Sequence, residues 1–378
     1  MLLDRHPPEE APMQRIQSFA EDQAEILAQE QRAGRISRRD LLAGLGALGM
    51  AAAMPGPAHA QARPEVVLVN WGGEAVPAFR EAFQAPYVAA GGRMVIDGSG
   101  PSNGKMKTMV QARNVTWDIC DSGVAGTGEL GPAGLLEEID YSIVDKGKVD
   151  TAFAYKYGVA NYMFSTVMAW NTRKVSGTPA IADFFDLKKY PGRRMLRRNQ
   201  QGMLEMALLA DGVPMEKLYP LDVDRAFRKL ETIKSQCLYW NSGAESQSLL
   251  RDGECVMGLL WNTRANLLKR DGGGLIDYTF KDGLLQPGLW VVPKGNPAGK
   301  EAMRAIAAMQ APEGQVKLLA SMGNGPANPA ASALVPDAVK ASNPSDPANV
   351  AVQAKIDADW YEKHGAAALQ RYLDFISA

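Results

Sequence analysis

The sequence predicts an α/β protein of two domains, each built on a mostly parallel β-sheet flanked by helices. From Glu65 onward, short apolar segments alternate with amphipathic ones, the rhythm of strands and helices that cover a sheet on both faces. About 318 of the 378 residues follow an N-terminal leader, and a chain of that length exceeds the size at which one hydrophobic core keeps growing. No second long apolar segment follows the leader, so we expect no membrane span.

The leader, residues 1–60, has the layout of an export signal. Arg38 and Arg39 stand directly before a small, apolar run, and Ala58-His59-Ala60 supplies the small residues at which a signal is cleaved. The arginine pair indicates the twin-arginine export machinery as a partner, and Gln61 after the cleavage site argues against a lipid anchor. We expect a twin-arginine signal peptide and a mature protein in the periplasm; the alternative is a cytosolic amphipathic helix.

The elements after the leader are expected in a regular order. Val66–Val69 is an apolar run typical of a strand buried on both faces, and Trp71-Gly72-Gly73 then turns the chain into a helix. Strands are expected at 66–69, 93–97, 117–121, 157–171, 256–261 and 290–293, and helices at 76–87, 105–112, 202–210, 223–235 and 300–309. We expect a basic loop over Arg193–Arg198 and a closing helical pair over 351–376.

Charge and residue counts exclude several functions. The leader holds six of the 41 basic and eight of the 42 acidic residues, so the rest of the chain is nearly neutral, which argues against a nucleic-acid partner. Only His364 follows the leader, so neither a two-histidine metal site nor a cofactor is expected. The three cysteines form no C-x-x-C pair, and a bridge between Cys237 and Cys255 stays open. Ferric-ion capture by the tyrosines at 141, 155, 157 and 162 is one alternative function, and an exported enzyme is another.

Aromatic residues and arginines mark the expected ligand site. Trp71, Trp240, Trp261 and Trp290 each stand at or near the end of an expected strand, where open α/β sheets bind ligands. A guanidinium of the basic cluster matches a carboxylate with two hydrogen bonds. The alternatives are tryptophans of the core and arginines that face solvent.

Several short motifs then recur in one order: Asn70-Trp71-Gly72-Gly73, Trp117-Asp118-Ile119, Asp252–Val256 leading to Trp261-Asn262, Trp290–Gly295, Gly325–Asn328 and Asp359-Trp360-Tyr361. In these motifs the sequence resembles the periplasmic spermidine/putrescine-type solute-binding proteins of ABC importers. The resemblance implies the two-lobed periplasmic binding protein fold (type II), in which the lobes close over a small-molecule solute by hinge motion. It also implies an inner-membrane ABC permease as partner, and we expect a monomer.

By this resemblance the chain crosses between the lobes near Val167, near Trp261 and at Gly295–Ala298. The first lobe is then expected to comprise 64–167 and 262–298, and the second 168–261 and 299–378. The ligand-binding residues are expected to be Trp71, Gly73, Glu74, Asp121, Ser122, Arg198, Asn199, Trp240, Trp261, Thr263 and Gln286.

The expected charge of the solute follows from missing acids. Polyamine binders of this type have carboxylates where this sequence has Asn199, Gly202 and Thr263. A desolvated diammonium ligand needs its charges paired. An amino-acid-like or aminobutyrate-like zwitterion therefore suits the site better than a polyamine, which stays the alternative. Arg198 would clamp its carboxylate, and Glu74 or Asp121, with the tryptophans, would hold its ammonium group.

Overall fold

The computed structural model describes residues 30, 33–35, 37 and 64–378. Arg38, Arg39 and the expected cleavage site lie outside these residues. The chain divides into two units, Met1–Ala62 and Arg63–Ala378, and the second unit holds the β-sheet. Among the described helices, none has both the length and the apolar content that a bilayer span requires.

One continuous mixed sheet runs through residues 64–378, in the order β2-β1-β3-β8-β4-β7-β5-β6. Its strands are β1 (Val66–Val69), β2 (Met94–Asp97), β3 (Ile119–Ser122), β4 (Val159–Asn171), β5 (Arg194–Arg197), β6 (Cys237–Trp240), β7 (Met257–Trp261) and β8 (Ile276–Val291). Two short strands pair beside this path, β9 (Gly325–Pro326) with β4 and β10 (Ala354–Lys355) with β8.

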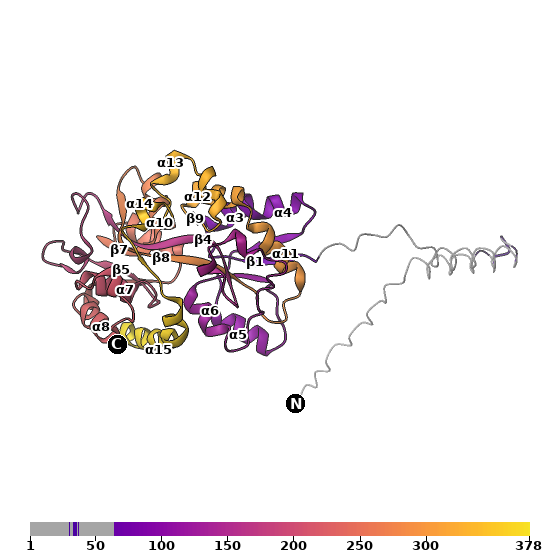
Figure 1. The fold of residues 1–378 in the computed structure, drawn as a ribbon, viewed down its shortest axis with the longest axis horizontal. Helices are drawn as coiled ribbons and strands as arrows, with labels where there is room; N and C mark the ends of the chain where they lie inside the picture. Colours follow the sequence, from indigo (N-terminus) through magenta and orange to yellow (C-terminus); the bar gives the residue numbers. More distant parts are fainter. Residues whose placement is uncertain (1–29, 31–32, 36, 38–63) are drawn as a thin grey trace, which may run out of the picture. The chain divides into compact units, whose positions relative to one another are not determined.

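The two longest strands, β4 and β8, run antiparallel through the middle of the sheet (Figure 1). One end of this pair, where Val159 lies opposite Trp290, continues through β3 into β1 and β2. The other end, where Asn171 lies opposite Ile276, continues through β7 into β5 and β6. The three outer strands at each end are parallel to one another, so each end of the sheet is the α/β layer of one lobe, as predicted.

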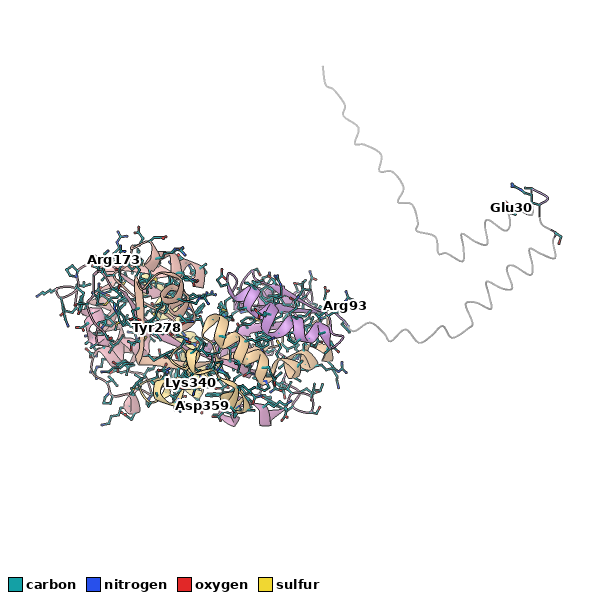
Figure 2. The ribbon with its side chains drawn as sticks, turned by 90° about the horizontal axis from the view of Figure 1, so that it is seen from above. Glu30, Arg93, Arg173, Tyr278, Lys340 and Asp359 are labelled. Atoms are coloured by element: carbon teal, nitrogen blue, oxygen red, sulfur yellow. The ribbon has the colours of Figure 1, made fainter. Side chains whose placement is uncertain are left out.

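Helices cover both ends of the sheet. In the first lobe they are α3 (Ala75–Phe79), a π-helical turn over Arg80–Gln84, α4 (Ala85–Ala89), α5 (Asn103–Gln111), α6 (Val124–Leu130), α11 (Lys300–Met309) and α12 (Pro312–Met322). In the second lobe they are α7 (Met203–Ala210), α8 (Val223–Glu231), α9 (Gly243–Arg251), α10 (Asn262–Asp271) and α15 (Ala358–Ser377). The short helices α13 (Asp337–Lys340) and α14 (Pro347–Val350) lie in the segment that connects α12 to α15. Figure 2 shows Arg93, next to β2, and Arg173, after β4, at opposite ends of the unit.

The packing places two segments in the other lobe from the one expected. Ile306 of α11 and Leu318 of α12 are fully buried against Val66 and Trp290 of the first lobe, whereas the sequence places 299–378 in the second. Leu268 of α10 packs with strand residues of the second lobe, whereas the sequence places 262–298 in the first. Helices α10, α11 and α12 each dock where their apolar face is buried, and sequence order alone does not define that place.

The crossings between the lobes explain this difference. The first crossing, through Val167 in β4, is as expected. The second is β8 itself, because α10 stays with the second lobe and the chain returns only along Ile276–Val291. The third follows α12, since β10 pairs with β8 near Leu284 and α15 then enters the second core through Tyr361. The crossings predicted near Trp261 and at Gly295–Ala298 are therefore wrong.

Three element predictions also differ from the structure. The expected basic loop contains strand β5, which lies between β6 and β7. The expected strand at 290–293 is only the last part of β8. The expected closing helical pair is the short strand β10 followed by the single helix α15, whose first turn is capped by the Asp357 side chain accepting from the amide of Trp360.

Both crossing strands are irregular at the same level. The register of β4 against β8 shifts between Thr166 and Met168. On β8, Asp282 has a φ of 58°, and a Cβ at Gly283 would lie 2.9 Å from the Phe280 carbonyl oxygen and 3.0 Å from that of Thr166. A register shift and a left-handed residue bend paired strands locally. This level of the sheet, between the two lobes, is where the strands depart from regular geometry.

Candidate ligand cavity between the lobes

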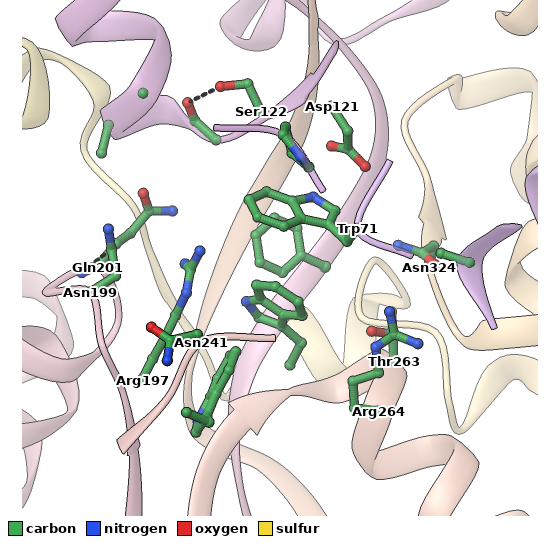
Figure 3. Close-up of a pocket in the computed structure, with 18 of the residues that line it drawn as sticks. Trp71, Asp121, Ser122, Arg197, Asn199, Gln201, Asn241, Thr263, Arg264 and Asn324 are labelled. Atoms are coloured by element: carbon green, nitrogen blue, oxygen red, sulfur yellow. Dashed lines mark hydrogen bonds between the residues drawn. The ribbon is translucent and has the colours of Figure 1, made fainter. Parts of the chain in front are cut away.

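A cavity of about 300 Å³ lies between the two lobes. The first lobe contributes the segments that follow β1 and β3, and the second contributes the segments that follow β5, β6 and β7, so the cavity lies at the carboxyl ends of these parallel strands. This is where open α/β sheets bind ligands. Figure 3 shows 18 of the residues that line it.

Three tryptophans form one wall of the cavity. The ring centres of Trp71 and Trp261 lie 5.3 Å apart, and those of Trp240 and Trp261 lie 5.0 Å apart in an edge-to-face arrangement. Trp240 is fully buried, and its indole N–H donates to the Leu259 carbonyl at 3.1 Å. Trp71 comes from the other lobe, so the aromatic wall is assembled from both.

The turn after β1 holds Trp71 in place. The Asn70 side chain accepts from the amide of Gly72 at 3.0 Å and donates to the Ala75 carbonyl at 3.0 Å, which fixes both ends of the turn. Gly72 has a φ of 70°, and a Cβ there would lie 2.5 Å from the Gly98 carbonyl oxygen. Glycine is therefore required at this position for two reasons, conformation and space.

Arg197 is the arginine of the aromatic wall. Its guanidinium carbon lies 4.8 Å from the ring centre of Trp261 and 5.7 Å from those of Trp71 and Trp240. Burial lowers the pKa of Arg197 to about 10, which leaves it charged at neutral pH. No hydrogen bond or ion pair joins this guanidinium to any other residue within 64–378. Its donors are thus available to a ligand.

Two neighbouring arginines show the contrast. Arg194, three residues earlier on β5, is fully buried, and its guanidinium donates to four backbone carbonyls, those of Phe184, Asp186, Tyr190 and Gly192. Arg198 lines the cavity too, but it is exposed. Its backbone amide donates to the Trp240 carbonyl, and its side chain forms no hydrogen bond with the residues that the structure describes. Side chains alternate between the faces of a strand, so Arg197 at the end of β5 points toward the tryptophans and Arg198 does not.

Asp121 supplies the negative charge. Among the described residues that line the cavity, it carries the only carboxylate. It is fully buried, and the Tyr162 hydroxyl donates to its two oxygens at 2.6 Å. Burial raises the pKa of Asp121 to about 7, against the opposing effect of hydrogen bonds from Tyr162 and Trp71. A cationic group beside Asp121 would favour its ionised form.

Most of the expected site residues lie around this cavity. Its lining includes Trp71, Asp121, Ser122, Arg198, Asn199, Trp240, Trp261 and Thr263. Three expected residues are not among those lining it. Gly73 and Glu74 are exposed at the start of α3, and Gln286 is buried behind the wall, where it donates to the Thr166 hydroxyl at 2.8 Å and accepts from Gln201.

Sequence patterns do not single out several other residues that line the cavity: Phe79, Asn103, Tyr162, Phe164, Arg197, Gln201, Asn241, Arg264, Met322, Asn324 and Leu369. For Arg197 a signal existed, because a strand over Arg194–Arg197 would have placed it and Arg198 on opposite faces. Arg264 directly follows the expected site residue Thr263. The sequence does not predict that the first turn of α10 faces the cavity.

The structure also answers the question left open for the cysteines, since Cys120, Cys237 and Cys255 are all free thiols. Within the part of the chain that the structure describes, no group of three or more His, Cys, Asp or Glu residues is arranged to hold a metal ion. Two of the tyrosines considered for ferric-ion capture have other partners. Tyr141 donates to the Tyr155 carbonyl, and Tyr162 donates to Asp121.

Comparison with known proteins identifies the family. The family model described as bacterial extracellular solute-binding protein matches residues 79–349. The chain belongs to this family. The predicted solute-binding function and the periplasmic binding protein fold are thereby confirmed, and an exported enzyme is no longer an alternative.

Individual relatives agree with this assignment. The gamma-aminobutyric acid-binding protein of Pseudomonas aeruginosa is 31% identical over 338 residues, which cover 87% of this chain and 94% of that protein. The structure of the Atu4243 GABA receptor is 34% identical, covers 83% of this chain and 98% of that one, and has a TM-score of 0.74. The structure of AgtB from A. tumefaciens R10 with agropinic acid is 32% identical, covers 85% of this chain and 100% of that one, and has a TM-score of 0.78.

Proposed function

We propose that this solute-binding protein captures a zwitterionic amino carboxylate in the periplasm and delivers it to an ABC permease in the inner membrane. The observation that carries the proposal is Arg197, a half-buried guanidinium among three tryptophans with no hydrogen-bond or ion-pair partner among the described residues. A carboxylate would take its donors in charge-assisted hydrogen bonds. The carboxylate-clamping role first assigned to Arg198 is thus proposed for Arg197.

The amine of the solute is assigned to Asp121. This carboxylate lines the same cavity, and the Tyr162 hydroxyl orients it. An ammonium group at Asp121 would complete an ion pair inside the cavity, while the faces of Trp71 and Trp261 would cover the methylene groups between the two charged ends. Glu74, the other carboxylate considered, is exposed at the start of α3 and does not line the cavity, so it has no part in the proposal.

A polyamine fits the same charges poorly. Within the described part of the chain, three arginines, Arg197, Arg198 and Arg264, line the cavity together with one carboxylate, that of Asp121. A dication would lie beside cations in a site of reduced dielectric, where repulsion grows as water is excluded. The ligands of the relatives, gamma-aminobutyric acid and agropinic acid, also support a carboxylate-bearing solute.

The periplasmic location and the twin-arginine route form a part of the proposal that rests on Arg38, Arg39 and the Ala58-His59-Ala60 site. Membership of a family of extracellular solute-binding proteins supports this part of the proposal, because such proteins act outside the cytoplasm. Lobe closure by bending at the irregular level of β4 and β8 is the proposed capture step.

The test is calorimetric titration of the purified protein with 4-aminobutyrate, longer amino carboxylates, putrescine and spermidine. The proposal expects binding of at least one amino carboxylate and, for both polyamines, an affinity lower by at least tenfold. Tighter binding of putrescine than of any amino carboxylate would overturn it.

A further inference from the structure

A second arginine in the cavity wall is as notable as Arg197. Arg264, in the first turn of α10, lines the cavity and is only 2% exposed. Its Nη2 donates across the cleft to the Gly72 carbonyl at 3.3 Å, a long bond. Its Nε is buried close to Gly243 and has no hydrogen-bond partner among the residues described.

This guanidinium also lacks an ion pair among the described residues. The Glu74 carboxylate favours its charged form, but Glu74 is exposed and the two groups form no salt bridge. Burial lowers the pKa of Arg264, so its charge is maintained against a desolvation cost. Buried charges are normally paired, and an unpaired one in a ligand cavity indicates that a ligand supplies the partner.

Arg264 and Arg197 occupy different places. Figure 3 shows them on opposite sides of Trp71, with Arg264 next to Thr263. Arg197 comes from the end of β5 and Arg264 from the start of α10. The two guanidiniums therefore form two anion positions around the aromatic wall.

The charges of the wall then define the solute more closely. Among the residues that the structure describes, the buried or half-buried lining holds two guanidiniums without ion pairs and one carboxylate, that of Asp121. A zwitterion with one carboxylate satisfies Arg197 and Asp121 and leaves Arg264 unpaired. We propose that the solute carries two acidic groups and one amine, with Arg264 as the residue that recognises the second acid. This inference rests on the proposed amino-carboxylate function and deepens it.

A competing role for Arg264 is that of a latch. Its bond to the Gly72 carbonyl joins α10 of the second lobe to the turn that carries Trp71 in the first. A latch would strengthen the binding of every solute to the same degree, because it stabilises closure rather than one ligand group. Recognition of a second acid would strengthen the binding only of solutes that carry a second acidic group.

The test compares solutes that differ by one carboxylate. 4-Aminobutyrate has one acid, glutamate adds a second on the carbon that carries the amine, and N-(carboxymethyl)-4-aminobutyrate adds it on the nitrogen. Titration calorimetry of the wild-type protein should give at least one diacid with a Kd about tenfold or more below that of 4-aminobutyrate, as expected for an added charge-assisted contact. In Arg264→Gln that preference should fall below about twofold while the Kd for 4-aminobutyrate stays within about threefold.

Controls separate the possible outcomes. Retained binding of 4-aminobutyrate shows that Arg264→Gln is folded, and Arg270→Gln, on the exposed side of the same helix, should leave every Kd unchanged. Arg264→Lys keeps the charge and should retain part of the preference. If the wild-type protein binds 4-aminobutyrate but no diacid more tightly, the inference fails and the proposed function stands. Equal weakening of all solutes by Arg264→Gln would identify a latch and overturn the inference, and a wild-type protein that binds no amino carboxylate would overturn both.

Discussion

The guanidinium of Arg197 lies 4.8 Å from the ring centre of Trp261, the shortest of its three indole contacts. Arg197 is the last residue of β5 and Trp261 is the last residue of β7, and these two strands pair in the second lobe. Cation–π attraction stabilises the guanidinium next to the indole without using its N–H groups. The arginine is thereby fixed in position while its hydrogen-bond donors stay available.

Arg197→Gln should weaken the binding of an amino carboxylate by about 1.5–3 kcal/mol, the range for a hydrogen bond to a charged group. Arg198→Gln is the matched control, because Arg198 lines the same cavity but is exposed. We expect that control to change the affinity by less than about 0.5 kcal/mol, the usual range for a surface substitution. Titration calorimetry measures both, and a larger loss for Arg198→Gln than for Arg197→Gln would show that the carboxylate lies at the rim.

Binding should depend on pH through Asp121. Burial raises its pKa to about 7 in the ligand-free protein, whereas an ammonium ligand needs the ionised form. The ionised fraction falls about tenfold from pH 8 to pH 6 for a group with this pKa, so the affinity should fall by about the same factor. Calorimetry in buffers of different ionisation enthalpy should also show proton release on binding near pH 7. The isosteric variant Asp121→Asn should bind weakly and lose this pH dependence; an unchanged pH profile in that variant would assign the titration to another group.

The same group affects stability in the opposite sense. Because the folded-state pKa of Asp121 lies above its unfolded value, the folded protein binds more protons between about pH 4 and pH 7. Its contribution to the free energy of unfolding is therefore most favourable below about pH 4 and is lost as the pH rises through 7. Comparing urea denaturation of ligand-free wild type and Asp121→Asn at pH 5.5 and 8 isolates this contribution. The wild type should lose more stability than the variant over that interval.

Gly283 should tolerate no side chain. A Cβ there would lie 2.9 Å from the Phe280 carbonyl oxygen and 3.0 Å from that of Thr166, and backbone atoms of two paired strands cannot move aside cheaply. Gly283→Ala should lower the free energy of unfolding by about 1–3 kcal/mol. Gly104→Ala is the control, since the nearest atom to a Cβ there is 3.9 Å away and α5 should gain up to about 1 kcal/mol in helix propensity. Urea denaturation measures the free energy of unfolding of both variants. Equal changes in the two would show that the close backbone contacts at Gly283 do not restrict this position.

Export should depend on the arginine pair. Replacing both Arg38 and Arg39 by Lys keeps the positive charge but removes the guanidiniums of the twin-arginine signal. The full-length precursor should then accumulate inside the cell, as seen by fractionation and immunoblotting. Normal appearance of the mature protein in the periplasm would exclude the twin-arginine route and leave another export route in its place.

Local patterns predicted much of the fold, and long-range packing accounts for most of the errors. The apolar run Val66–Val69 and the amphipathic stretch over Lys300–Met309 are a strand and a helix, as expected. The lobe to which that helix belongs follows from its burial against Trp290, a contact that no local periodicity encodes. Likewise the sequence does not predict the first half of β8, which begins at Ile276. This half contains Asp277, Thr279 and Lys281 and lacks the apolar run of a buried strand.

In the site, too, local patterns predict some residues and tertiary packing determines others. Trp71 and Trp261 were found from their positions at strand ends, which sequence can predict. The sequence favours Arg198 over Arg197 because it predicts a loop over this basic segment, and in a loop the two positions are not distinguished. Once β5 is known to be a strand, its alternation decides between them. Arg264 depends on how α10 docks, a tertiary property.

The pairing of Cys120 in β3 with Val291 in β8 has a consequence for how the chain matures. During synthesis, β1, β2 and β3 are complete long before β8 emerges, and their sheet has an open edge until then. The first lobe also needs α11 and α12, which come later still. Neither half of the polypeptide contains all the parts of one lobe. A chain that ends before α11 should therefore leave both lobes unfinished, and one that ends between α12 and α15 should leave only the second lobe unfinished.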